Sequence, residues 1–308
     1  MDISSILSLL QTSVELGLVS SLTVLALFLS YTMLNVCDLS TDGCFTLGAA
    51  VGAVVALSGH PFLSIPAAML AGVTSGFITG ILQTKMGIDS LLSGIIVNTA
   101  LYSINIAIMG NSSLINLNKT ETVFTMLKTA LSGTSMAGMY KAVIAVIAVA
   151  ATVIFLALFL STRLGLAIRA TGNNPDMVRS SSINPVFTTL VGLCVANAFT
   201  ALSGCMLGQL QKSVNIDIGT GMVTMALASL LIGRAFLGRG KITTRAIGAV
   251  LGAVIFRIVY AVALRFNMLA FMLKFVSSVI VIIAISGPYL KSRIPVIKRR
   301  LSAKKARA

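Results

Sequence analysis

Nine long apolar segments run through the sequence, and they restrict the folds open to it more than any other feature. They cover approximately residues 12–34, 44–58, 62–82, 91–110, 141–161, 185–211, 219–233, 246–264 and 268–288. A helix needs about 20 apolar residues to cross a bilayer, and most of these segments provide them. Only 10% of the residues are charged and 56% are apolar, whereas soluble domains contain about 25% charged residues. The sequence therefore predicts an all-α integral membrane protein with about nine transmembrane helices, in the range of eight to ten.

The basic residues lie mostly at one set of segment ends. Eight of the 23 Lys and Arg residues fall between Lys291 and the C-terminus, and others fall in the loops 83–90, 162–184 and 234–245. Basic loops usually face the cytoplasm, so we expect these loops and the C-terminus to be cytoplasmic. Because nine spans is an odd number, the N-terminus is then outside. This arrangement explains the net charge of +15 without nucleic acid, and we expect none as a partner.

Two of the apolar segments are unusually short and occupy matching places in the two halves of the chain. Segments 44–58 and 219–233 each follow a polar stretch, Asp38–Thr41 and Asp217–Thr220. In the predicted topology they run in opposite directions, which is typical of the inverted repeats of transporters. We therefore predict one transmembrane domain over 1–308 with two inverted repeats and two short broken or re-entrant segments. Its parts are a first repeat at about 12–110, an external loop at 111–140 with a short amphipathic helix near 121–131, a second repeat at about 141–288 and a basic cytoplasmic tail at 289–308.

Several kinds of chemistry are disfavoured. All eight carboxylates lie at segment ends or in loops, so proton coupling is not expected. The stretch Gly238–Thr243 lacks the spacing of a phosphate-binding loop, so we expect no ATP hydrolysis and no enzymatic activity from this chain. One histidine and four scattered cysteines predict no metal site. The N-terminal region has no early basic residue, and a cleaved signal peptide is not expected.

Polar residues in or beside the spans are candidates for a transport path. They are Asp38, Thr41, Asn98, Ser103, Asn105, Asn197, Thr200, Asp217 and Thr220. Buried amides more often fasten helices to one another than bind a transported solute, so both roles stay open for them. Arg257 falls near the middle of its span, where a charge requires a function or a structural partner. Backbone carbonyls and Asp217 are the expected partners.

The loop at 165–184 contains signals for a short helix. Asn174 and Pro175 suit an N-cap and a first helical position. Asp176 then lies in the first turn and Arg179 toward the end, as the helix dipole prefers. On these residues alone, a short polar helix at the cytoplasmic face and a plain solvated loop both remain open.

This loop resembles the coupling-helix loop of permeases from bacterial ATP-binding-cassette (ABC) importers of the branched-chain amino acid and ribose type. The resemblance extends to residues 38–50 (DLSTDGCFTLGAA), residues 92–105 (LSGIIVNTALYSIN) and Gly233–Arg234, in order and spacing. Within the family, the chain is most similar to the subgroup paired with binding proteins for aromatic amino acids. The resemblance implies a permease in the bacterial inner membrane that imports a small solute, most of all an aromatic or branched-chain amino acid. Alternatives are a nucleoside or sugar importer of the same family, or an ion-coupled secondary transporter.

The resemblance also implies partners. They are a second permease subunit in a homodimer, two copies of a cytoplasmic ATPase subunit and an extracytoplasmic substrate-binding protein. ATP and Mg²⁺ would bind to the ATPase, and this chain would bind no cofactor. The residues implied in coupling to the ATPase are Gly172, Asn173, Asn174, Pro175, Asp176, Met177, Val178, Arg179, Ser180, Ser181 and Ser182.

Overall fold

The computed structural model describes residues 3–130, 139–238 and 240–265, together with residues 275, 278–279, 281–282 and 286. Within them, seven helical segments are long and apolar enough to cross a membrane. These segments are Ser8–Met33, Ser64–Thr84, Ser90–Ile108, Tyr140–Ser161, Pro185–Gln211, Ile216–Leu237 and Ile242–Ala263. An eighth apolar helix, Thr41–Leu57, is shorter. The all-α membrane fold is therefore confirmed. The ninth predicted segment, 268–288, and the predicted tail, 289–308, lie outside the described residues apart from the isolated positions above.

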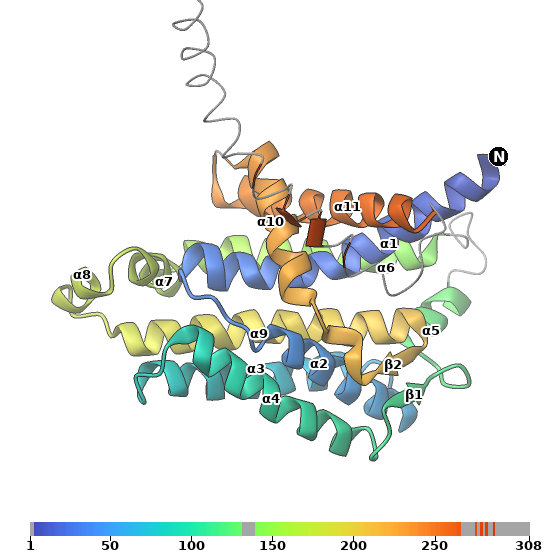
Figure 1. Cartoon of the computed structure of the whole chain (residues 1–308), viewed down its shortest axis with the longest axis horizontal. Helices are drawn as coiled ribbons and strands as arrows, with labels where there is room; N and C mark the ends of the chain where they lie inside the picture. Colours follow the sequence, from blue (N-terminus) through green and yellow to red (C-terminus); the bar gives the residue numbers. More distant parts are fainter. Residues whose placement is uncertain are drawn as a thin grey trace, which may run out of the picture.

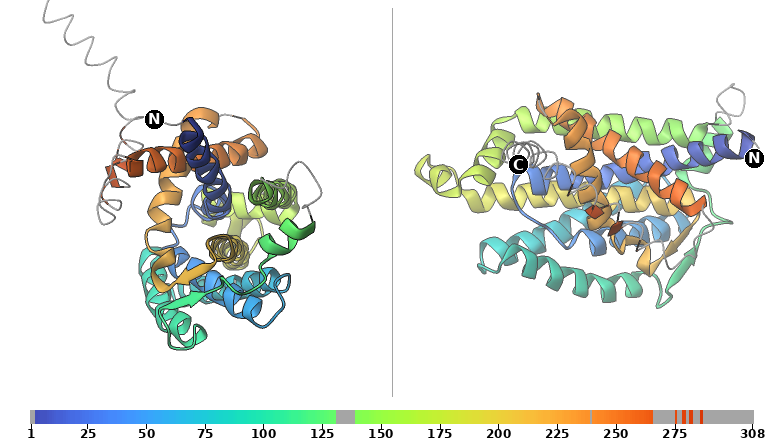
Figure 2. Two further views of the ribbon diagram at one scale, coloured as in Figure 1. Left: turned by 90° about the vertical axis from the view of Figure 1, so that its right-hand side faces the viewer. Right: turned by 45° about the horizontal axis from the view of Figure 1, so that its top comes forward.

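Most of the long helices lie roughly side by side around α9, as Figures 1 and 2 show. Helix α9 (Pro185–Gln211) lies between a group formed by α2 (Thr41–Leu57), α3 (Ser64–Thr84) and α4 (Ser90–Ile108) and a group formed by α1 (Ile3–Leu27), α6 (Tyr140–Ser161) and α11 (Ile242–Arg265). Helix α10 (Met222–Leu237) runs across these helices, from the start of α2 toward α11 (Figure 1). Helix α1 continues directly into a π-helical turn, η1 (Phe28–Met33).

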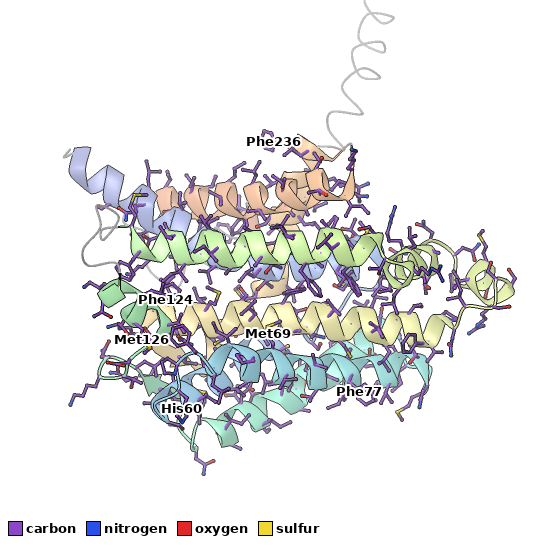
Figure 3. The ribbon with its side chains drawn as sticks, turned by 180° about the vertical axis from the view of Figure 1, so that it is seen from behind. His60, Met69, Phe77, Phe124, Met126 and Phe236 are labelled. Carbon is purple, nitrogen blue, oxygen red and sulfur yellow. The ribbon has the colours of Figure 1, made fainter. Side chains whose placement is uncertain are left out.

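Close helix contacts in the interior depend on glycine. A Cβ atom added at Gly72 would overlap the Asn197 carbonyl oxygen, and one added at Gly76 would lie against the Leu193 carbonyl oxygen. Both glycines are on α3 and face α9. Small residues spaced four apart allow such backbone approach in membranes, where packing rather than the hydrophobic effect holds helices together. Outside the bundle, large apolar side chains such as Phe77 and Phe236 project outward, as lipid-facing residues do (Figure 3).

The two ends of the bundle differ. At one end, strand β1 (Leu114–Asn116) pairs antiparallel with β2 (Ser213–Asn215) beside the short helix α5 (Val123–Ala130). Helix α5 falls within the range predicted for an amphipathic helix. At the opposite end lie α7 (Arg163–Asn173) and α8 (Pro175–Ser180), as Figure 1 shows. The N-terminus lies at the end that carries the strands.

The second short segment differs from its prediction in length. Helix α10 is preceded by a 3-10 turn, η2 (Ile216–Gly219), and together they form a span of 22 residues, Ile216–Leu237. A break separates the two parts at Gly221, whose φ of 85° is in the left-handed region that favours glycine. The segment is thus broken, as predicted, and long enough to span. Two inverted repeats remain a prediction.

Candidate translocation cavities and coupling helix

The two predicted short segments contact each other through Asp42, although only the second is broken, since α2 is a continuous helix. The Oδ2 atom of Asp42 accepts a hydrogen bond from the Gly221 N–H at 2.9 Å, and its Oδ1 accepts one from the Val223 N–H at 2.8 Å. These amides are at the start of α10, where unpaired N–H groups and the helix dipole favour a negative charge. Gly219 lies so close to α2 that a Cβ atom there would overlap the Asp42 carbonyl oxygen. Asp42 therefore joins the start of α2 to the start of α10.

A polar cavity of about 380 Å³ opens beside this contact, and we call it the α2–α4 cavity. Its lining residues are Asp42, Gly43, Thr46, Asn98, Thr99, Tyr102, Ser103, Asn105, Ile216, Asp217 and Thr220. Five of the nine path candidates thus come together here: Asn98, Ser103, Asn105, Asp217 and Thr220. They come from α4 and from the η2–α10 junction, which the sequence separates by more than a hundred residues. The cavity offers hydroxyl, amide and carboxylate groups to a small solute.

The other four path candidates are buried in the helix packing. Asp38 is 1% exposed, and its Oδ2 accepts a hydrogen bond from Asn197 Nδ2 at 2.9 Å. Thr41 donates to the Asp38 carbonyl oxygen, and Thr200 donates to the carbonyl oxygen of Ala196 within α9. Asp38 is in a loop, as the sequence predicts, but its own side chain is buried. In this structure these four side chains link α9 to the start of α2 or bond within their own elements.

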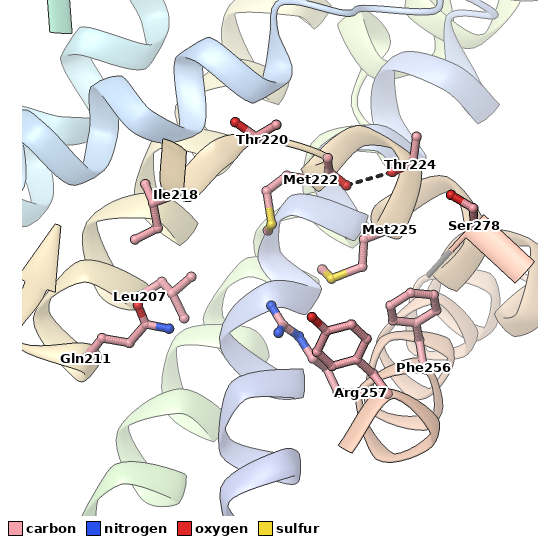
Figure 4. Close-up of a pocket in the computed structure, with 12 residues that line it drawn as sticks. Leu207, Gln211, Ile218, Thr220, Met222, Thr224, Met225, Phe256, Arg257 and Ser278 are labelled. Carbon is pink, nitrogen blue, oxygen red and sulfur yellow. Dashed lines mark hydrogen bonds between the residues drawn. The ribbon is translucent and has the colours of Figure 1, made fainter. Parts of the chain in front are cut away.

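A second cavity of about 420 Å³ lies between α9, α10 and α11, and we call it the α9–α11 cavity (Figure 4). Arg257 lines it. Its Nη2 and Nε donate to Ser20 Oγ at 2.7 and 3.2 Å. Asp217, one of the expected partners of Arg257, lines the α2–α4 cavity instead. Thr220 lines both cavities, so the η2–α10 junction lies between them.

Helix α8 begins where the sequence signals for a short helix lie. Asn174 Oδ1 accepts hydrogen bonds from the N–H groups of Asp176 and Met177, both at 3.1 Å, so Asn174 is the N-cap as predicted. Val178 is buried, whereas Met177 is 66% exposed and Arg179 is also exposed. The helix therefore presents an apolar and a basic side chain outward at the end of the bundle.

The rest of the predicted coupling segment lies on either side of α8. Gly172 and Asn173 form the end of α7, a helix that the sequence analysis did not separate from the loop. Ser181 and Ser182 follow α8, and Ser182 has a φ of 59°. Gly172 packs directly on the backbone after η1, since a Cβ atom there would overlap the Met33 carbonyl oxygen. The segment is thus connected to α1 as well as exposed.

Asp42 lines the α2–α4 cavity but is not among the path candidates predicted from the sequence. Its separation from Gly221 is 179 residues, the same offset that aligns Asp38–Thr41 with Asp217–Thr220 in the sequence. That repeated offset was the available signal. Within the described ranges, no group of three or more His, Cys, Asp or Glu side chains is placed to hold a metal ion.

Comparison with known proteins gives a consistent family assignment. Residues 9–285 match the family of the branched-chain amino acid transport system permease component. A tyrosine transport system permease protein of Clostridioides difficile is 31% identical over 267 residues, which is 86% of each chain. A nucleoside ABC transporter permease protein of Lactococcus lactis is 28% identical over 180 residues, covering 52% of this chain and 48% of the relative. No solved structure gives a significant match.

Proposed function

The chain belongs to the family of branched-chain amino acid transport permeases and is the permease component of an ABC transport system; on this basis we propose that it imports an amino acid, aromatic or branched-chain. The observation that carries this proposal is the similarity to a tyrosine transport permease, which extends over 86% of both chains. The similarity to a nucleoside permease covers about half of each chain, and a nucleoside importer is the second candidate. In this family the ATPase is a separate subunit.

The exposed helix α8 is the proposed docking point for that ATPase. Coupling helices must transmit a movement, and two contacts connect α7, which directly precedes α8, to the bundle. Gly172 at the end of α7 packs on the backbone at Met33, and the hydroxyl groups of Thr171 and Thr188 are 2.8 Å apart. A displacement of α8 would therefore move the end of α1 through the first contact and the start of α9 through the second.

The segment after η1 would carry the same movement to the cavities. It leads through Asp38 to α2, and Asp42 at the start of α2 holds the start of α10. We assign the translocation path to the α2–α4 and α9–α11 cavities, which share Thr220. The interior polar residues Asp38, Thr41, Asn197 and Thr200 would hold the helices beside this path. ATP binding at the partner ATPases would alter the packing of α2 against α10 and so change access to this path. The chain itself would bind neither ATP nor Mg²⁺.

The proposed assembly has two copies of this permease, two ATPase subunits and one external substrate-binding protein. The end with α8 faces the cytoplasm in this arrangement, because the basic loops lie there. The N-terminus, at the opposite end of the bundle, is then outside. The end with β1, β2 and α5 would receive the substrate-binding protein.

ATP-dependent uptake into proteoliposomes tests this function. The vesicles hold the permease with its ATPase, and the binding protein is added outside with labelled tyrosine, tryptophan, leucine, uridine or ribose in turn. We expect uptake of an amino acid that requires ATP and is lost in the Arg179→Glu variant, because reversing an exposed charge on α8 disrupts docking. Uptake of uridine alone would favour the nucleoside importer. Uptake that does not require ATP, and that the variant retains, would favour a secondary transporter.

A further inference from the structure

Arg257 is a charged side chain inside a membrane span. It lies in the second half of α11, and its partner Ser20 lies in the second half of α1. Ser20 is 1% exposed, so the guanidinium contacts the protein interior on that side. On its other side the guanidinium faces the α9–α11 cavity, as Figure 4 shows. Ionisable residues within spans normally have a charged or carbonyl partner, or take part in function.

The chain provides no carboxylate for Arg257 in the described structure. Residues 266–308 contain no Asp or Glu, and every carboxylate except Asp2 lies among the described residues. Asp42, on the other side of the η2–α10 junction, accepts hydrogen bonds from backbone amides with both of its oxygens. Across the described residues, the two hydrogen bonds of the guanidinium both go to Ser20 Oγ. An arginine has five N–H donors, so three remain for a ligand.

The cavity around the guanidinium has the composition of a site for an amphipathic ligand. Phe256, Tyr260 and Met225 line it with aromatic and thioether surface, and Gln211 and Thr220 add polar groups. Its volume of about 420 Å³ is in the range of small-molecule pockets, about 300–1,000 Å³. A planar guanidinium binds a carboxylate through two parallel hydrogen bonds, with defined orientation.

We propose that Arg257 binds the carboxylate of the transported solute in the α9–α11 cavity. The aromatic wall would then contact an apolar or aromatic side chain of the same solute. Ser20 is a positioning residue, because it fixes one edge of the guanidinium and leaves the other edge for the ligand. This inference rests on the proposed importer function, and it specifies the substrate class: a solute with a carboxylate rather than a neutral nucleoside or sugar.

Ligand binding to the purified permease–ATPase complex, measured as a shift of its melting temperature, tests this inference. The probes are L-tyrosine, hydroxyphenylpropionate, which keeps the carboxylate but lacks the ammonium group, and tyramine, which lacks the carboxylate. We expect the first two to stabilise the wild-type complex and tyramine to have no effect. In Arg257→Gln the apparent affinity for tyrosine should fall at least tenfold. Lys85→Gln, which removes an exposed charge between α3 and α4, is the matched control and should keep the wild-type response.

Several outcomes would overturn the inference. Equal stabilisation by tyramine and tyrosine would show that the carboxylate is not recognised, and an unchanged tyrosine response in Arg257→Gln would show that another group binds it. A lipid phosphate or a purely structural role predicts lower stability of Arg257→Gln with the tyrosine response retained. If Arg257→Gln fails to assemble, Arg257→Lys provides the test. Its affinity for tyrosine should fall, because an ammonium group cannot form the paired hydrogen bonds. An unchanged affinity would contradict the proposal. Absence of any ATP-dependent uptake by the wild type would instead contradict the importer function itself.

Discussion

Asp42 on α2 caps the start of α10, with its Oδ2 2.9 Å from the Gly221 nitrogen, although the two residues are 179 positions apart. One carboxylate thereby connects the start of α2 to the start of α10, and both cavities adjoin the junction that it holds. A change at this contact would affect the geometry of both.

Replacing Asp42 should destabilise the protein. Asp42→Ala removes two charge-assisted hydrogen bonds from a half-buried site and leaves the amides of Gly221 and Val223 without these acceptors. We expect a loss of about 3 kcal/mol in the free energy of unfolding, and a smaller loss for Asp42→Asn, which retains one acceptor oxygen. Asp89→Ala is the control, because Asp89 caps the exposed start of α4 with one bond and should cost only about 1 kcal/mol. Equal losses at the two positions would contradict this account.

The glycines of α3 should differ in their tolerance of a methyl group. Gly72→Ala and Gly76→Ala force a Cβ atom against the carbonyl oxygens of α9, and overpacking of this kind costs about 1–3 kcal/mol. At Gly80 the nearest atom to an added Cβ is Leu190 Cα at 3.3 Å, so Gly80→Ala should change stability by less than about 1 kcal/mol. Melting temperatures of the three variants, measured in one detergent, give the order of their stabilities. If Gly80→Ala were as unstable as Gly72→Ala, the close contact between α3 and α9 would not explain the stability of these variants.

The N-cap of α8 should matter for coupling more than for folding. Asn174→Ala removes the acceptor for two amides of a six-residue helix, and losing such a cap costs about 1 kcal/mol. We expect α8 to fray and ATP-driven uptake to fall several-fold with a nearly unchanged melting temperature. Asn184→Ala is the matched control, because Asn184 caps the 27-residue α9 in the same Asn-Pro arrangement. That variant should retain most of its uptake; parallel losses in both variants would argue against a coupling role for α8.

Two asparagines should separate transport from packing. Asn98 is half-buried in the α2–α4 cavity, so Asn98→Leu should lower uptake with little effect on stability. Asn197 donates to the buried Asp38 carboxylate, so Asn197→Leu should lower the free energy of unfolding by about 2–3 kcal/mol. Both predictions are tested by measuring the uptake rate and the unfolding midpoint of each variant. Normal uptake in Asn98→Leu would remove this cavity from the proposed path.

Much of the fold could be predicted because its signals are local. The bounds of α9, 185–211, agree with the sequence prediction: Asn184 and Pro185 mark its start, and Lys212, with a φ of 54°, ends it. Similarly, Asn174 and Pro175 indicated the start of α8. Apolar length alone located the long spans.

Features that depend on distant contacts could not be predicted in the same way. In the sequence Asp42 is only one of several carboxylates near segment ends, because its partners are amides of a distant segment. Helix α7 is not evident as a separate element in the sequence, although the Thr162 side chain caps its start. Which polar residues share the α2–α4 cavity depends on how α4 packs beside η2, and composition does not specify that.

The pairing of β1 with β2 has a mechanical consequence. Backbone hydrogen bonds connect Leu114–Asn116 to Ser213–Asn215, so the chain after α4 and the chain after α9 are fastened to each other at one end of the bundle. Helix α8 lies at the other end. Because the strands hold one end together, a displacement of α8 would separate the helices most at the α8 end. Near the strands the helices would hardly move apart.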